Sequence, residues 1–152
     1  MIKNFDLLAN TKMERKALQI LESGLMAAQP KNFLKKFVNK NYISLGKDRI
    51  VLSKYRKIFV VAYGKAASSM AEYVVKKINI SKGIIVIPKY TKSSLISKKF
   101  VIIHAGHPIP DRESVKAGKI VQKFVESCSK EDFILFLISG GEIGRASCRE
   151  RV

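Results

Sequence analysis

Four nearly continuous apolar runs mark the part of the chain after residue 56. They read KIFVVAY at 57–63, GIIVIP at 83–88, FVIIHA at 100–105 and FILFLIS at 133–139. Runs that are apolar on both faces are typical of strands buried on both sides of a parallel sheet. A helical pattern follows the first run to about Ile78, and residues 111–128 are a clear amphipathic helix. We therefore predict an α/β fold with a Rossmann-like, open and mostly parallel sheet that carries helices on both faces.

The first third of the chain has a different pattern. Residues 11–28 place leucines on one face at helical spacing, and Thr11 with Glu14 has the capping-box pattern. Gln29-Pro30 ends this helix and opens a short second one. Residues 41–54 predict a small hairpin. The polar segment 89–99 is too short for a full crossover helix, which leaves a hairpin or an irregular link open.

Composition adds a strong positive charge to this picture. The formal net charge is +17, but 22 of the 29 basic residues are lysines scattered through every segment. Nucleic-acid readers favour arginine and a recognisable motif, so we predict no nucleic-acid partner, with a basic nucleic-acid-binding protein kept as a third hypothesis. No apolar run approaches the about 20 residues that span a membrane, and the N-terminus has no secretory pattern. The two cysteines have no paired spacing, so we expect a reducing cytoplasm.

Two segments at strand ends carry candidate chemistry. In YGKAASSM, Gly64 and Lys65 follow a strand and open a helix, where backbone N–H groups and an ammonium can hold an anion. In HAGHPIPD, two prolines hold His107 and Asp111 in fixed relation. Each residue also has an ordinary structural reading: a glycine turn, a loop histidine bonded to the backbone, and for Asp111 a helix N-cap.

A third such segment is LISGG. A buried strand that ends in Ser139, Gly140 and Gly141 lets the backbone approach a ligand closely, with the serine hydroxyl as an additional donor. Its ordinary reading is a strand-to-helix turn. Ligands of open α/β sheets bind at the carboxyl ends of the strands, so all three segments are expected at one edge.

The ordered set GKAA, GHPIPD and SGG, from about Arg15 to Gly141, resembles the N-terminal domain of the glycerate 2-kinase family, also described as putative hydroxypyruvate reductases. The resemblance implies phosphorylation of D-glycerate at its 2-hydroxyl by ATP with Mg²⁺. It also implies a first domain that faces a smaller C-terminal domain across the active-site cleft.

The resemblance also implies roles for individual residues. Lys65 would be catalytic and neutralise the transferring phosphoryl group. Asp111 would orient or deprotonate the glycerate hydroxyl, and His107 would line the cleft. Gly64, Ser139, Gly140 and Gly141 would bind phosphate or carboxylate oxygens. No protein ligand of a metal is assigned.

The final residues depart from the family pattern. After SGG the family continues with more glycine and a Ser-Ala-rich helix, whereas this chain continues EIGRASCRERV. Read back into codons, that stretch matches a common short-read sequencing adapter apart from its first base. We therefore expect residues 1–141 to be the N-terminal part of the kinase's first domain, residues 142–152 to be a non-native tail, and the recorded chain to be inactive. The alternative function is a stand-alone α/β module that binds a phosphorylated metabolite without catalysis.

Overall fold

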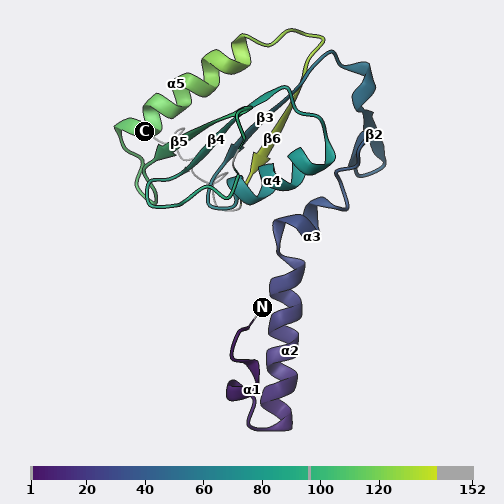
Figure 1. Cartoon of the computed structure of the whole chain (residues 1–152), viewed down its shortest axis with the longest axis vertical. Coiled ribbons are helices and arrows are strands. Elements are labelled where there is room, and N and C mark those ends of the chain that lie inside the picture. The colour runs from purple at the N-terminus through teal and green to yellow at the C-terminus, as the bar shows by residue number, and fades with distance from the viewer. Residues whose placement is uncertain (1, 96, 140–152) are drawn as a thin grey trace, which may run out of the picture.

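The computed structural model describes residues 2–95 and 97–139, and it has an α/β architecture built on a four-stranded sheet (Figure 1). The sheet strands are β3 (Ile58–Tyr63), β4 (Lys82–Pro88), β5 (Phe100–Ala105) and β6 (Phe133–Ile138). The helices are α1 (Phe5–Leu8), α2 (Lys12–Ala27), α3 (Pro30–Leu34), α4 (Ala67–Lys77) and α5 (Arg112–Glu126), with a short 3₁₀ helix at Leu52–Lys54. A separate antiparallel hairpin pairs β1 (Tyr42–Leu45) with β2 (Asp48–Val51).

The strand order is β5-β4-β3-β6, and every neighbouring pair in this sheet is parallel. The predicted Rossmann-like sheet is therefore confirmed. The link 89–99 joins two parallel strands, which excludes the hairpin alternative and leaves the irregular one. After β5 the chain passes through α5 and returns beside β3, so the direction of strand succession reverses between β3 and β6. Such a reversal is the topological switch point at which open α/β sheets bind ligands.

Alternate residues of β3 face opposite layers of the fold. Val60 and Ala62 are fully buried in the core cluster that includes Met70 and Val74 of α4. Phe59 instead packs edge-on against Phe124 of α5, with ring centroids 5.5 Å apart. Because strand side chains alternate, a central strand that is apolar on both faces requires a helical layer on each. The predicted helices on both faces are thus present (Figure 1).

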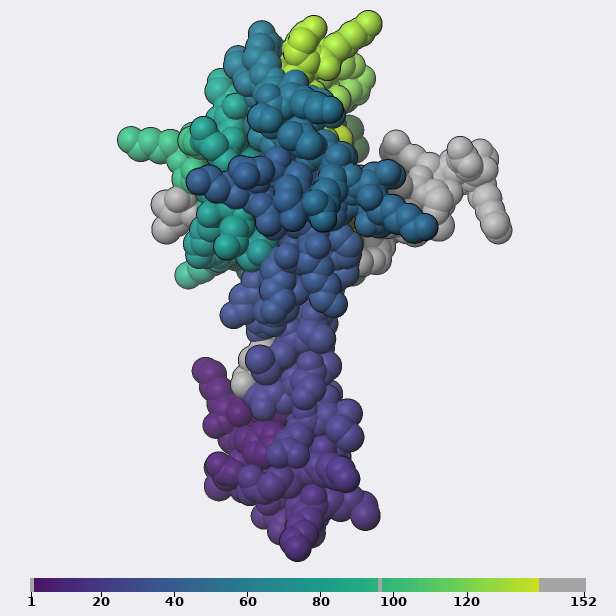
Figure 2. Space-filling model, turned by 90° about the vertical axis from the view of Figure 1, so that its right-hand side faces the viewer, coloured from purple at the N-terminus to yellow at the C-terminus, as the bar shows by residue number. Residues whose placement is uncertain are grey.

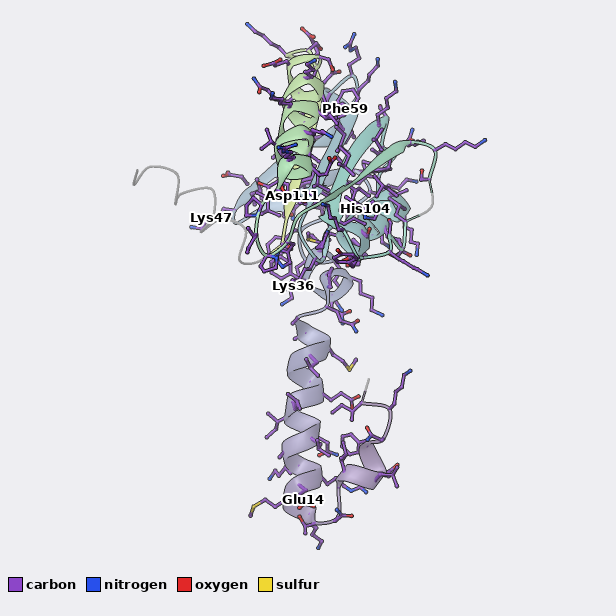
Figure 3. All side chains as sticks on the ribbon, turned by 90° about the vertical axis from the view of Figure 1, so that its left-hand side faces the viewer. Glu14, Lys36, Lys47, Phe59, His104 and Asp111 are labelled. Carbon is purple, nitrogen blue, oxygen red and sulfur yellow. The ribbon has the colours of Figure 1, made fainter. Side chains whose placement is uncertain are left out.

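The N-terminal helices form an arm that projects from the sheet layer (Figures 1 and 2). The capping box of α2 is formed as predicted, since the Thr11 hydroxyl accepts from the Glu14 backbone N–H and the Glu14 carboxylate accepts from the Thr11 N–H. Glu14 lies at the far end of the arm (Figure 3). No residue of α2 is buried, and the apolar side chains of Leu21 and Leu25 are exposed. Local capping and periodicity thus specify the helix without burying it.

The strand β6 lies at one edge of the sheet, where β3 is its one neighbour in the described part of the chain. Phe136 pairs with Val61 in register and is 45% exposed on the face that α5 covers elsewhere.

Across residues 2–95 and 97–139, no helix combines the length and the low polarity that a membrane crossing requires.

Candidate active site

The ends of the strands bring two of the predicted segments into direct contact. The Ser139 backbone N–H donates to the Tyr63 carbonyl at 3.2 Å, and the Gly64 N–H donates to the Val86 carbonyl at 3.1 Å. Gly64 and Ser139 therefore lie at the carboxyl ends of neighbouring strands, at the switch point. Gly140 and Gly141, together with the predicted tail 142–152, lie outside the described residues.

The helix α4 begins without a side-chain cap. Gly64 has a φ of 100°, a conformation that favours glycine, and its carbonyl accepts from the Ala67 N–H at 3.1 Å. The N-cap position is occupied by Ala66, which has no side chain able to accept from the first-turn N–H groups. Lys65 lies between them and is exposed. An uncapped helix N-terminus beside a lysine favours the binding of an anion.

The helix α5 begins in the opposite way, because its first turn is closed by a carboxylate. The Asp111 Oδ1 accepts from the Ser114 backbone N–H at 2.9 Å, and the Ser114 hydroxyl accepts from the Asp111 N–H at 3.1 Å. The same Oδ1 accepts from the Gly106 N–H at 3.1 Å. The N-cap reading of Asp111 is thus confirmed, and its catalytic role stays a prediction.

A lysine from a neighbouring strand end completes this cap. The Lys89 ammonium lies 2.5 Å from Asp111 Oδ2. The hydrogen bond from Lys89, followed by that from the Ser114 backbone, holds the pKa of Asp111 well below its ordinary value of 3.8. Asp111 consequently stays ionised, which makes it a good hydrogen-bond acceptor and a weak base.

Gly106, the first residue of GHPIPD, has a role in this loop that the sequence did not predict. A Cβ at this position would lie 2.6 Å from the Ile109 carbonyl oxygen and 2.7 Å from the Asp111 Cγ. The loop can therefore close on Asp111 only with glycine at position 106. The signal in the sequence is the glycine that directly precedes HPIPD.

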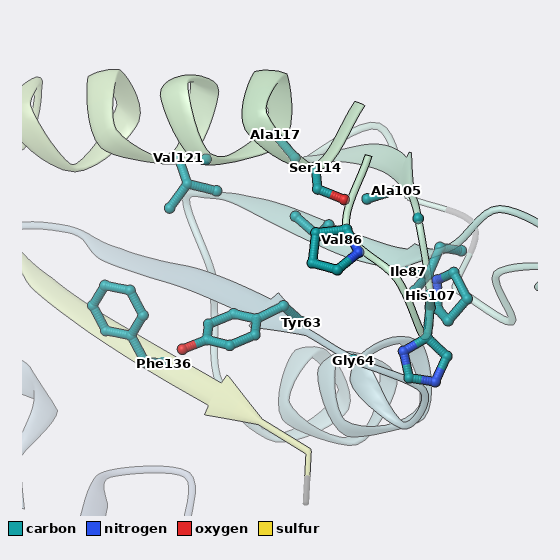
Figure 4. A pocket seen from close by; sticks show the side chains of 14 residues that line it. Tyr63, Gly64, Val86, Ile87, Ala105, His107, Ser114, Ala117, Val121 and Phe136 are labelled. Carbon is teal, nitrogen blue, oxygen red and sulfur yellow. The ribbon is translucent and has the colours of Figure 1, made fainter. Parts of the chain in front are cut away.

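A pocket of about 470 Å³ opens between α5 and the ends of β3, β4 and β5 (Figure 4). Tyr63 and Phe136 lie on one side of it, whereas Ala117 and Val121 of α5 lie on the other. Its volume falls within the range of about 300–1,000 Å³ that is usual for small-molecule sites.

The structure brings some of the predicted site residues together and separates others. Gly64 and His107 both line the pocket. Lys65 adjoins Gly64 in the chain but does not line the pocket, and the Asp111 carboxylate contacts Lys89 and the first turn of α5. The predicted residues thus surround two neighbouring places, the open start of α4 and the pocket.

The described residues do not form a metal centre. Within 2–95 and 97–139, no three or more His, Cys, Asp or Glu side chains gather as a metal site would need. The Asp111 carboxylate is already paired with Lys89.

Comparison with known proteins identifies relatives of this arrangement. Residues 16–146 match the family model described as a domain of unknown function, DUF4147. The chain is 34% identical over 131 residues to a D-glycerate 2-kinase of Thermotoga maritima, an alignment that covers 85% of this chain and 28% of the relative. It is 28% identical over 145 residues to a glycerate 2-kinase of Picrophilus torridus, covering 93% of this chain and 32% of the relative. The chain thus spans less than a third of the length of these curated relatives.

Two solved structures share the fold. A protein from Pyrococcus horikoshii superposes with a TM-score of 0.71 at 26% identity, over 86% of this chain and 30% of that one. A glycerate kinase from Thermotoga maritima superposes with a TM-score of 0.61 at 33% identity, over 82% of this chain and 28% of that one. The resemblance predicted from GKAA, GHPIPD and SGG is confirmed: the chain belongs to the DUF4147 family and is similar to glycerate 2-kinases.

Proposed function

We propose that this sequence is part of an ATP-dependent kinase that phosphorylates D-glycerate at its 2-hydroxyl and forms 2-phosphoglycerate. The observation that carries the proposal is the uncapped start of α4, with Gly64 and Lys65 at the switch point. The similarity to glycerate 2-kinases supports the choice of substrate. A phosphoryl group needs a place where several anionic oxygens meet N–H donors and a cation, and this position offers both.

In this proposal Lys65 acts on the transferring phosphoryl group. Its ammonium extends over the start of α4 and stabilises the charge that spreads over the phosphoryl oxygens in the transition state. The Gly64 and Ser139 N–H groups already donate to the Val86 and Tyr63 carbonyls. In this proposal Gly64 lets the ligand approach the backbone closely, and the Ser139 hydroxyl with the backbone at Gly140 and Gly141 donates to phosphate or carboxylate oxygens. Those contacts position the reactants and do no covalent chemistry.

We assign His107 to the wall of the cleft and Asp111 to the glycerate hydroxyl. Because the pKa of Asp111 lies below its ordinary value, this carboxylate can accept a hydrogen bond from the hydroxyl more readily than it can remove the proton. The proposed role of Asp111 is therefore orientation. The nucleotide is proposed to arrive as its Mg²⁺ complex, in which the phosphates are the metal's main ligands.

We further propose that residues 1–141 are the N-terminal part of the first domain and that residues 142–152 are not native. On this view the 152-residue chain is inactive, since the relatives are more than three times longer than the part that it matches. A second candidate function is a stand-alone module that binds a phosphorylated metabolite without catalysis, and the pocket of about 470 Å³ is large enough for a small ligand.

The test is to recover the gene beyond codon 141, express the longer protein and incubate it with ATP and D-glycerate. Phosphorus NMR should detect 2-phosphoglycerate. His107→Ala and Ser139→Ala should weaken substrate or nucleotide binding, whereas the exposed Lys92→Ala should not. A native stop codon after Val152, or a longer protein without glycerate-dependent ATP consumption, would refute the proposal. The 152-residue chain should bind ligand without turnover.

A further inference from the structure

The pocket beside α5 has a chemistry unlike that of a glycerate site. Its lining residues all lie in the described part of the chain, and none of them is Lys, Arg, Asp or Glu. Glycerate is a small carboxylate with two hydroxyls, so its binding needs a cation and several hydrogen-bond donors. The pocket therefore fits a flat and mostly apolar group better than the acceptor substrate.

The walls of the pocket suit an aromatic ring system. Ala117 and Gly118 put small residues on the α5 side, which leaves room between the helix and the sheet. Tyr63 and Phe136 contribute aromatic rings on the sheet side (Figure 4). Aromatic side chains can hold a nucleobase by stacking on its flat face, whichever base it is.

The pocket also connects to the proposed phosphate position. Gly64 lines it and, two residues later, Ala66 is the N-cap of α4. A ligand with its ring between α5 and the sheet can thus extend an anionic chain past Gly64 to the helix start. A nucleoside carrying phosphates has this combination of one apolar end and one anionic end.

We propose that the pocket binds the adenine base and ribose of the phosphoryl donor, with the phosphates directed toward Gly64 and Lys65. This inference rests on the proposed kinase function. It places the base and ribose of the donor on this chain and assigns the acceptor no residue beyond those already proposed for it. The competing occupant is a further segment of polypeptide that covers Phe136, which is exposed.

Gly118 allows the pocket to be blocked without disturbing its surroundings. Among the described residues, no heavy atom beyond the chain neighbours and the backbone of the same helix lies within 4 Å of a Cβ built on Gly118, and the same holds for Gly24 in α2. Both glycines are inside helices, where replacement removes a residue of poor helix propensity. Gly118→Leu should fill the pocket, and Gly24→Leu is its matched control in the arm.

The first experiment titrates uncharged adenosine into the isotope-labelled 152-residue chain and follows amide NMR shifts. Adenosine carries no phosphate, so it probes the pocket alone. We expect shifts concentrated at Tyr63, Ala117 and Val121, lost in Gly118→Leu and kept in Gly24→Leu. Absence of these shifts at millimolar adenosine, or equal shifts in both variants, would overturn the proposal and favour the polypeptide occupant.

The second experiment uses the longer protein and separates this inference from the kinase function. Calorimetry should show at least a tenfold loss of ATP affinity in Gly118→Leu and none in Gly24→Leu, with or without turnover. If kinetics are measurable, KM for ATP should rise while KM for D-glycerate stays constant. A rise in KM for D-glycerate alone would overturn the donor assignment. If ATP binds in the pocket but D-glycerate is not phosphorylated, the proposed function fails and the pocket assignment stands.

Discussion

The two helices that begin at the ligand-binding edge of the sheet start in opposite ways. Asp111 closes the first turn of α5 with its own carboxylate and draws in Lys89. Ala66 leaves the first turn of α4 without a side-chain acceptor, next to Gly64 and Lys65. A helix N-terminus attracts negative charge wherever it occurs. At α5 the chain supplies that charge itself, whereas at α4 the N-cap residue supplies none, and we propose that a ligand does.

The largest effect is expected from Lys65→Met, which keeps the apolar stem and removes the charge. In the longer enzyme kcat should fall by about 10² to 10³, the usual scale for one lost electrostatic donor, while KM changes far less. Initial-rate kinetics test this, and circular dichroism should show an unchanged fold because Lys65 is exposed.

Lys65→Arg serves as the matched variant, because it keeps the charge. It should restore little activity, since the planar guanidinium cannot take the place of a compact ammonium in the same geometry. Undiminished turnover in Lys65→Met would show that this lysine does not act on the phosphoryl group.

The next effect is expected from Ala66→Asp, which gives α4 a carboxylate where α5 has one. A fixed negative charge should repel phosphate, so nucleotide affinity should fall by about tenfold or more, which corresponds to about 1.4 kcal/mol. Calorimetric titration of ATP measures the affinity, and a thermal melt checks that the protein is not destabilised.

The neutral Ala66→Asn is the control, since it can cap the helix without charge. It should reduce the affinity less than the aspartate does. Equal ATP affinity in the wild type and Ala66→Asp would mean that the start of α4 does not bind phosphate.

A smaller effect is expected when the cap of α5 is opened. Asp111→Ala should lower Tm by about 2–8 °C, because the Ser114 N–H and the Gly106 N–H lose their acceptor. Asp111→Asn keeps a capping oxygen and loses only the ion pair with Lys89, so most of the Tm should be retained.

Differential scanning calorimetry separates these variants. Equal Tm losses in Asp111→Ala and Asp111→Asn would show that the ion pair, not the cap, stabilises this turn. A fall in kcat for Asp111→Asn with Tm retained would support the orienting role proposed for this carboxylate.

The smallest effect is expected at Asp132, a carboxylate at the start of β6 and away from both helix starts. Its side chain is 2% exposed and pairs with Arg56 at 3.2 Å, and hydrogen bonding from Arg56 lowers its pKa from 3.8 to about 2. A carboxylate whose pKa is lowered in the folded state stabilises the fold at pH values above its ordinary pKa. This stability is lost as the pH falls through the pKa of the folded state. Asp132→Asn should therefore lower Tm at pH 7, with the difference from wild type closing between about pH 4 and pH 2. A difference that does not depend on pH would contradict this origin.

Local features of the fold could be predicted from the sequence. The Thr11–Glu14 capping box and the apolar strands depend on residues close together in the chain, and they form where the pattern indicates. The reversal that puts β6 beside β3 depends on packing across the sheet, which periodicity does not encode. The fold class was thus predictable, whereas the position of the last strand was not.

The candidate site was predictable to a similar depth. The position of Gly64 could be predicted because it follows a strand, and the carboxyl ends of parallel strands lie at one edge of the sheet. The pairing of Lys89 with Asp111 was not predicted, since it joins loops after different strands through side chains whose directions the motif does not fix. The pocket was missed for the same reason, because Ala117 and Gly118 are unremarkable as helix residues until α5 lies over the sheet.

The pairing of β6 with β3, which the ion pair between Arg56 and Asp132 accompanies, has a consequence for how the chain folds during synthesis. These residues are 76 positions apart and lie at the starts of β3 and β6. The strands β3, β4 and β5 pair in the order in which they leave the ribosome, whereas β6 pairs with the strand made first. One long edge of β3 therefore stays open until the last described strand has emerged, and this edge is where a nascent chain can be captured by another before folding is complete.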